Sequence, residues 1–121
     1  MAIIMKFKLL FILFSILFLI SSGYHLAALF FPLNESPPWR NMLFTVINIL
    51  AAAGLLKRPA WFIFPYILLM IQQLYSHGSD LVGLWNAEHR FDWISMLVLM
   101  IMPAIFVFLV ADRTARRNKT T

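Results

Sequence analysis

The sequence predicts an all-α membrane protein, an antiparallel bundle of four transmembrane helices. Two observations lead to this prediction. Of the 121 residues, 62% are hydrophobic and only 12% are charged, whereas soluble domains are about half apolar and about a quarter charged. The apolar residues fall into four runs, and the Lys and Arg residues cluster between those runs. We therefore expect lipid to surround most of this chain.

The first apolar run spans residues 7–31 and follows two lysines, Lys6 and Lys8. It is long enough to cross a bilayer, which takes about 20 residues. Its beginning also looks like a signal peptide, because a triplet of small residues at 21–23 could serve as a cleavage site that removes residues 1–23. The apolar character continues beyond this triplet, so we expect the run to be retained as an anchor.

The second apolar run, residues 39–56, follows the proline-rich connection PLNESPP at 32–38. Proline lacks an amide hydrogen and disfavours helix in the residue before it, so this connection separates two helices. A basic turn at 57–59 leads into the third run, residues 60–77, which contains Pro65. We expect a kink at this proline, because membrane helices tolerate proline where neighbours satisfy the freed carbonyl.

The longest polar stretch, residues 76–92, follows the third run and still contains several Leu and Trp side chains. We expect it to form a short segment in the membrane interface between helices 3 and 4. The fourth run spans residues 93–111, and a basic tail follows at 112–121. We find no internal repeat or linker, so residues 1–121 are predicted to form a single integral membrane domain.

The distribution of basic residues predicts the orientation. If the N-terminus is cytoplasmic, eight of the ten Lys and Arg residues lie on the cytoplasmic side and only Arg40 and Arg90 lie outside. Because short loops rich in Lys and Arg stay in the cytoplasm, both termini are predicted to be cytoplasmic. Scattered basic clusters of this kind do not form a nucleic-acid patch. The lack of cysteine and the short loops favour a bacterial inner membrane.

Several kinds of chemistry are excluded or disfavoured. The chain contains no cysteine, so it has no disulfide, thiolate metal site or dithiol redox pair. The centres of the four runs contain no Asp, Glu, Lys or Arg, which disfavours an ion-coupled transporter. The sequence around His77 and His89 contains possible metal ligands but no recognised ligand spacing. We therefore assign no metal site and no catalytic residue, and we leave any cofactor open.

Polar side chains gather in the outer halves of the runs. In lipid they should face other helices and find hydrogen-bond partners. They serve either as contacts between helices or as a ligand pocket open to the outside, and the sequence leaves both interpretations open. The candidate ligand-binding cluster at the outer face consists of His25, Asn41, Thr45, Asn48, Gln72, Gln73, Ser76, His77, Asp80 and His89.

Part of the chain resembles the small four-helix DoxX-like membrane proteins. Gly23 and His25 lie near the outer end of the first run, a short proline-bearing connection follows, and the second run ends in Gly54-Leu55-Leu56-Lys57-Arg58. The resemblance covers residues 22–68. It implies a four-helix membrane architecture, in a family whose members are linked in places to quinone or redox partners.

These observations favour a non-enzymatic integral membrane protein, either an accessory subunit or a small-ligand-binding bundle. Its expected partners are the lipid bilayer and other membrane subunits or further copies of the chain. The alternative is a membrane enzyme or redox protein that acts on a lipid or quinone at the outer interface, with His25, His77, Asp80 and His89 as working groups. The alternative function requires the histidines to converge on one cavity. In the first function each histidine can contact a separate neighbour.

Overall fold

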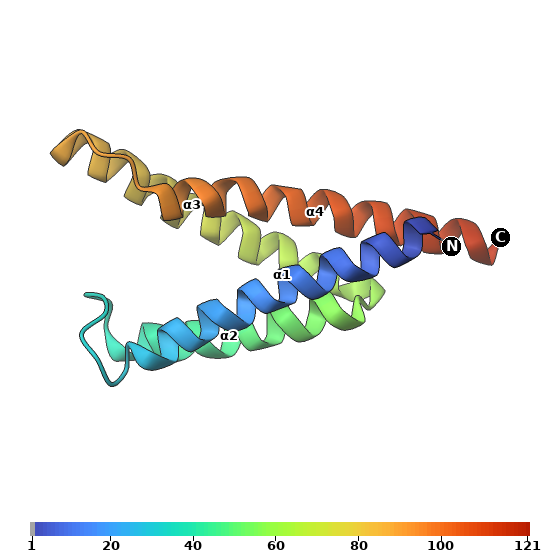
Figure 1. Ribbon diagram of the computed structural model, residues 1–121, viewed down its shortest axis with the longest axis horizontal. Helices are drawn as coiled ribbons and strands as arrows, with labels where there is room; N and C mark the ends of the chain where they lie inside the picture. Colours follow the sequence, from blue (N-terminus) through green and yellow to red (C-terminus); the bar gives the residue numbers. More distant parts are fainter. Residues whose placement is uncertain (1) are drawn as a thin grey trace. The chain divides into compact units, whose positions relative to one another are not determined.

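The structure, a computed structural model, describes residues 2–121, with side chains from Lys6 onward. Within these bounds the chain forms four α-helices, one short 3-10 helix and no strand (Figure 1), which confirms the all-α fold with four helices. The elements in order are α1 (Ala2–Ala27), α2 (Pro38–Lys57), η1 (Ala60–Phe62), α3 (Ile63–Glu88) and α4 (Trp93–Thr120).

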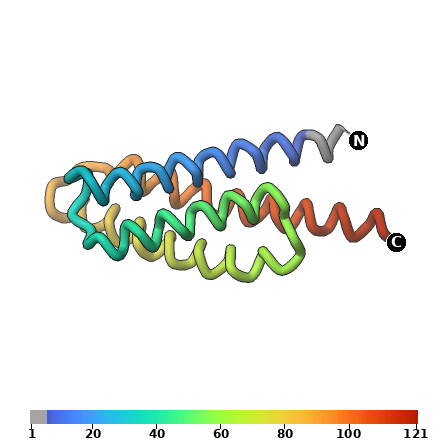
Figure 2. The backbone as a smooth tube through the Cα atoms, turned by 90° about the horizontal axis from the view of Figure 1, so that it is seen from below, coloured from blue at the N-terminus to red at the C-terminus, as the bar shows by residue number. Residues whose placement is uncertain are grey.

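The helices pack in two pairs. The chain divides into two compact units, Met1–Pro59 and Ala60–Thr121. In the first unit α1 packs along α2, and in the second α3 packs along α4, so each unit is a helical hairpin (Figures 1 and 2). We call these units the first and second hairpin and describe each by itself.

Local sequence signals set the ends of the helices. Helix α2 begins at Pro38, a position where the missing amide of proline costs no hydrogen bond. It ends before Arg58, which adopts a left-handed conformation with φ of 47° and donates its amide to the carbonyl of Gly54. Helix α3 ends in the same way before His89, with φ of 50° and an amide bond to the carbonyl of Trp85. Both ends therefore satisfy a terminal carbonyl without a glycine.

Helix α3 is longer than the third apolar run. Residues 76–88, expected to belong to a separate interfacial segment, continue α3 as far as Glu88. The half-buried residues Leu74, His77, Leu81 and Leu84 recur every three or four positions, which is the period of a helix with one packed face. The connection between α3 and α4 is therefore reduced to residues 89–92.

The two helical prolines occupy different positions. Pro65 is the third residue of α3, within the first turn, where backbone amides have no acceptor inside the helix. The kink expected from a proline in mid-helix therefore does not apply to Pro65. Pro103 lies inside α4, and the helix continues beyond it to Thr120. The basic tail is thus part of α4.

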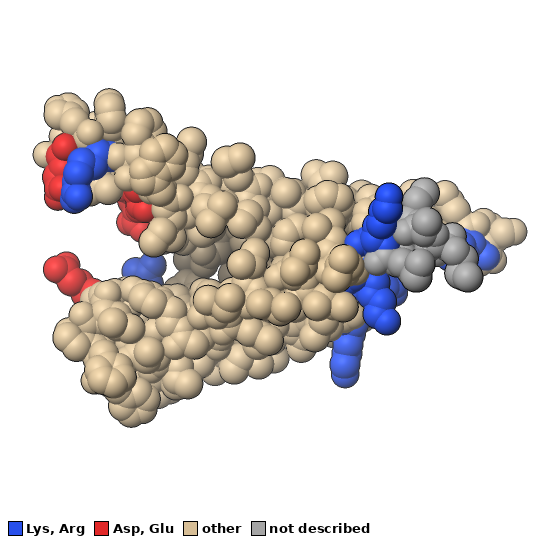
Figure 3. Space-filling view, viewed as in Figure 1, with Lys and Arg blue, Asp and Glu red and all other residues tan. Residues whose placement is uncertain are grey.

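In the described part of the chain three helices are long and apolar enough to cross a membrane: α1 from Lys6 to Ala27, α2 over its full length, and α4. Helix α3 is not among them because its second half is polar. Large apolar side chains are exposed on all four helices, which a water-soluble protein would avoid. On the visible face of each hairpin the charged side chains lie at its ends (Figure 3). The chain thus has the helices of a membrane protein.

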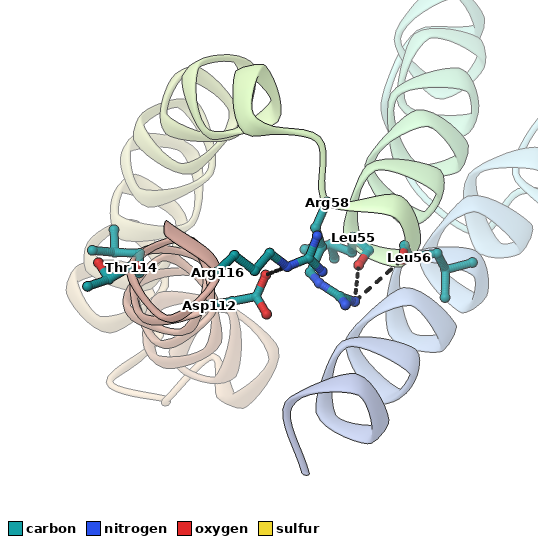
Figure 4. A network of polar contacts seen from close by, with 7 residues as sticks. Leu55, Leu56, Arg58, Asp112, Thr114 and Arg116 are labelled. Carbon is teal, nitrogen blue, oxygen red and sulfur yellow. Dashed lines mark hydrogen bonds and ion pairs between the residues drawn. The ribbon is translucent and has the colours of Figure 1, made fainter. Parts of the chain in front are cut away.

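The basic end of each hairpin has its own polar contacts (Figure 4). In the first hairpin Nη1 of Arg58 donates to the carbonyls of Leu55 and Leu56, at 3.3 and 3.4 Å. In the second hairpin Nε of Arg116 lies 3.0 Å from Oδ2 of Asp112, one helical turn earlier. Both contacts hold basic side chains against the helix from which they project.

Candidate functional site

Side-chain hydrogen bonds connect α1 to α2 along the outer half of the first hairpin. The hydroxyl of Ser22 donates to the carbonyl of Thr45 at 2.8 Å, and Nδ2 of Asn48 donates to Oγ of Ser21 at 3.1 Å. The hydroxyl of Thr45 donates within α2 to the carbonyl of Asn41. Thr45 and Asn48, two members of the predicted cluster, therefore serve as contacts between or within helices.

Asn41 is the centre of a buried polar cluster in the first hairpin. Its side chain is 1% exposed. Its Oδ1 lies 3.1 Å from Nδ2 of Asn34 and 3.0 Å from Nδ1 of His25, and its own Nδ2 donates to Oδ1 of Asn34 at 3.1 Å. The two asparagines thus connect the loop to α2, and His25 connects α1 to the same cluster.

The backbone of Ser36 fixes the orientation of both amides. Its N–H donates to Oδ1 of Asn34 at 3.1 Å, and its carbonyl accepts from Nδ2 of Asn41 at 3.5 Å. A backbone amide can only donate and a carbonyl can only accept, so neither amide can be flipped. Oδ1 of Asn41 therefore faces His25 as an acceptor, and Nδ1 of His25 must carry the hydrogen.

The second hairpin has a chain of three polar side chains where α3 meets the start of α4. Ser95, 1% exposed, donates its hydroxyl hydrogen to Oδ2 of Asp92 at 2.6 Å, and its Oγ lies 2.9 Å from Nδ1 of His77. Oδ1 of Asp92 also accepts the backbone N–H of Ser95 at 3.1 Å. Asp92 is therefore the N-cap of α4 and also the last of these three hydrogen-bonded side chains.

The carboxylate of Asp92 determines which group donates in each hydrogen bond of this row. An ionised carboxylate only accepts, so the single hydroxyl hydrogen of Ser95 is used on Asp92 and its oxygen accepts from His77. Nδ1 of His77 therefore carries a hydrogen, as in His25. The bonds from the Ser95 hydroxyl and amide, assisted by the charge of His77, lower the pKa of Asp92, because they favour its ionised form.

A buried hydroxyl also joins the two helices of each hairpin deeper in the structure. Ser15 donates to the carbonyl of Ala52 at 3.0 Å, and the hydroxyl of Tyr66 donates to the carbonyl of Met102 at 2.8 Å. The two hairpins thus have the same plan. A histidine on the first helix bonds a polar side chain near the start of the second helix, and a hydroxyl on the first helix bonds a backbone carbonyl of the second.

The remaining predicted residues lie on α3 or just after it. Nε2 of Gln73 donates to Oε1 of its neighbour Gln72. Ser76 is half-buried and Asp80 is exposed. His89 is exposed at the end of α3, with its ring edge-on to that of Trp85 at 5.6 Å.

His77 is thus connected through Ser95 to the carboxylate of Asp92. Across residues 2–121 no group of three or more His, Asp or Glu side chains could hold a metal ion.

Sequence reasoning omitted Asn34, Ser36, Asp92 and Ser95 from the candidate cluster. Two local signals could have identified them. Asn34 accepts the N–H of the residue two positions later, the Asx-turn pattern of loop asparagines. Asp92 caps the residue three positions later, the usual N-cap pattern. Asn34 lies in the loop before α2 and Asp92 lies at the start of α4, and each bonds a side chain of the helix that follows it.

No protein-family model, curated protein or solved structure matches this chain. The resemblance of residues 22–68 to DoxX-like proteins remains a prediction. The function is therefore argued from the geometry of the two hairpins.

Proposed function

We propose that this chain is a non-enzymatic integral membrane protein that serves as an accessory subunit of a larger membrane assembly. One observation supports this function above others: the buried polar groups of the candidate cluster form hydrogen bonds within the hairpins. Among the described residues every buried side-chain nitrogen or oxygen has a hydrogen-bond partner. A binding or catalytic site usually keeps polar groups directed at its ligand.

The burial of the polar residues favours a subunit over a ligand-binding bundle. Asn41 and Asn48 are buried, and their amides bond Asn34 and Ser21. A ligand could reach these amides only by displacing a partner that already satisfies them, which would cost a hydrogen bond for each one gained. In this proposal the exposed apolar faces of the helices contact lipid and neighbouring membrane helices.

We further propose that all four helices cross the membrane, with both termini in the cytoplasm of a bacterial cell. If α3 did not cross, the basic residues of α4 would lie outside with Arg40, and the ten Lys and Arg residues would divide five to five. Four crossings divide them eight to two, which the distribution rule for basic residues favours. Retention of residues 1–23 is supported by the bonds from Ser21 and Ser22 to α2.

Single cysteines test this topology directly, because the chain has none of its own. We expect a membrane-impermeant maleimide added to intact cells to label Glu35→Cys in the first loop and to leave Thr114→Cys unlabelled until the cells are opened. Both positions are exposed. Labelling of Thr114→Cys from outside would instead indicate three crossings and would overturn the four-span proposal.

Purification from the native membrane tests the subunit role. We expect the mildly solubilised protein to migrate as part of a larger complex containing other membrane proteins. The double variant His25→Ala/His77→Ala should first be shown to insert and fold. Any loss of the assembled complex in this variant should then be no larger than its loss of folded protein. A protein that purifies alone under conditions that preserve other membrane complexes would contradict this role.

The chain of His77, Ser95 and Asp92 supports a second candidate, an enzyme acting at the outer interface. With Nδ1 bonded to Ser95, a neutral His77 has its basic lone pair on Nε2, the atom that a general base uses. In that case His77→Ala abolishes function in protein that still folds, and Asp92→Asn reduces it. Under the subunit proposal His77→Ala in folded protein is mild, so this variant separates the two functions.

A further inference from the structure

The last nine residues of α4 form a basic extension, residues 112–120, beyond the apolar part of the helix. Its basic side chains are all exposed, and its one acidic side chain, Asp112, is buried and paired with Arg116 at 3.0 Å. In the second hairpin α4 runs past the start of α3 in both views (Figures 1 and 2). The basic residues are Arg113, Arg116, Arg117 and Lys119.

The length of α4 places the basic extension at a definite depth. The helix has 28 residues, which at 1.5 Å per residue is about 42 Å. The hydrocarbon core of a bilayer is about 30 Å thick. If Trp93 lies at one interface, where tryptophan is favoured, about 20 residues bring the helix to Asp112 at the other interface. The extension then lies at the depth of the lipid phosphates.

The helix also brings the basic side chains together. Arg113 and Arg117 are four residues apart and Arg116 is three residues after Arg113, so these side chains lie along one side of the helix. Arginine suits a phosphate because its planar guanidinium can donate two parallel hydrogen bonds. A helix that emerges from the membrane thus presents closely spaced cations where phosphates are concentrated.

We propose that the basic extension of α4 binds the headgroups of anionic phospholipids in the leaflet where this helix ends. Clusters of four or more Lys and Arg immediately next to a transmembrane helix attract anionic lipid in this way. The binding orders lipid around the second hairpin and anchors the end of α4 at the surface. It rests on α4 crossing the membrane and is independent of the subunit role.

Spin-labelled lipids test this binding on the full-length protein reconstituted in phosphatidylcholine vesicles. We expect the protein to immobilise spin-labelled phosphatidylglycerol in preference to spin-labelled phosphatidylcholine. In the variant Arg113→Gln/Arg117→Gln/Lys119→Gln this preference should be at least fivefold smaller than in the unmodified protein. A fivefold change is about the effect of one charge near an anionic surface. The preference of the unmodified protein should also fall as salt is raised to about 1 M, where the screening length is about 3 Å.

A charge-matched control distinguishes a site on α4 from the general charge of the protein. The variant Lys6→Gln/Lys8→Gln/Lys57→Gln also removes three charges, all from the first hairpin, and should keep the lipid preference. Resistance to carbonate extraction shows that each variant is inserted. Equal losses in the two variants would overturn the proposal, as would equal immobilisation of the two lipids by the unmodified protein. Equal immobilisation of the two lipids would instead indicate that the basic extension binds an acidic protein segment.

Discussion

The hydroxyl oxygen of Ser95 lies 2.9 Å from Nδ1 of His77, and this contact joins the beginning of α4 to the middle of α3. The same hydroxyl donates its hydrogen at 2.6 Å to Asp92, which caps α4 by accepting the backbone N–H of Ser95. A single serine thus connects the N-cap of α4 to a side chain of α3. Helix start and helix packing are therefore coupled in the second hairpin.

The coupling predicts the tautomer of His77. When its ring is uncharged, His77 should carry its hydrogen on Nδ1, because the oxygen of Ser95 is available only as an acceptor. Nitrogen-15 NMR of the side chain in detergent measures this directly. Ser95→Ala should let both tautomers appear, whereas the exposed His89 should be unaffected by that variant. An Nε2 hydrogen on His77 in the unmodified protein would show that the direction of the chain is wrong.

Asp92 predicts a pH dependence of stability. Its pKa in the folded protein is below the ordinary 3.8, so its contribution is fully present above about pH 4 and is lost as the pH falls through the folded pKa. We expect Asp92→Asn to be less stable than the unmodified protein at pH 6, and to lose less stability between pH 4 and pH 2. Thermal unfolding in detergent measures both effects.

The exposed Asp80 supplies the control for this pH dependence. Asp80→Asn should keep the acid-induced loss of the unmodified protein, because an exposed carboxylate has no such bonds to lose. If the two variants follow the same curve between pH 4 and pH 2, the cap at Asp92 does not account for the acid sensitivity.

Asn41→Ala should destabilise the first hairpin. The substitution removes four side-chain bonds, one to His25, two to Asn34 and one to the carbonyl of Ser36. At about 0.6 kcal/mol for each bond within a membrane protein, the expected loss is about 2 kcal/mol in the free energy of unfolding. Unfolding in mixed detergent micelles measures it. The adjacent Met42→Ala is the matched control, because that side chain is 59% exposed, and an equal loss in both variants would contradict the prediction.

Tyr66→Phe should weaken the second hairpin by about 1 kcal/mol, the usual net contribution of one buried hydrogen bond. The hydroxyl of Tyr66 donates to the carbonyl of Met102, and the tyrosine is 1% exposed. Tyr75→Phe removes the same atom from a side chain that is 78% exposed. The two variants should therefore differ in midpoint of thermal unfolding, and identical midpoints would show that the buried bond contributes nothing.

Hydropathy predicted the four helices but not their ends. The second run, 39–56, agrees with α2 to within one residue at each end. The third and fourth runs were too short, because a hydropathy pattern detects apolar content while a helix is held by backbone hydrogen bonds that polar residues also make. Helix α3 therefore continues through Gln72 and Asp80 until His89 turns left-handed, and α4 includes the basic tail.

The polar contacts were predictable where they follow helix periodicity. Asn41, Thr45 and Asn48 are three or four residues apart, a spacing that puts side chains on one side of a helix, and Asn41 and Asn48 bond side chains of α1. Contacts that depend on a loop or on the backbone were not predictable. Asn34 reaches Asn41 only because the loop folds back, and the acceptor for Ser15 is a carbonyl, which every residue has.

The cluster around Asn41 has a consequence for how the protein is made. Its members are His25, Asn34, Ser36 and Asn41, and the deeper bond from Ser15 reaches Ala52. All of them are synthesised before Pro59, so these bonds need nothing from α3 or α4. The first hairpin can thus close in the membrane while the ribosome is still translating the second.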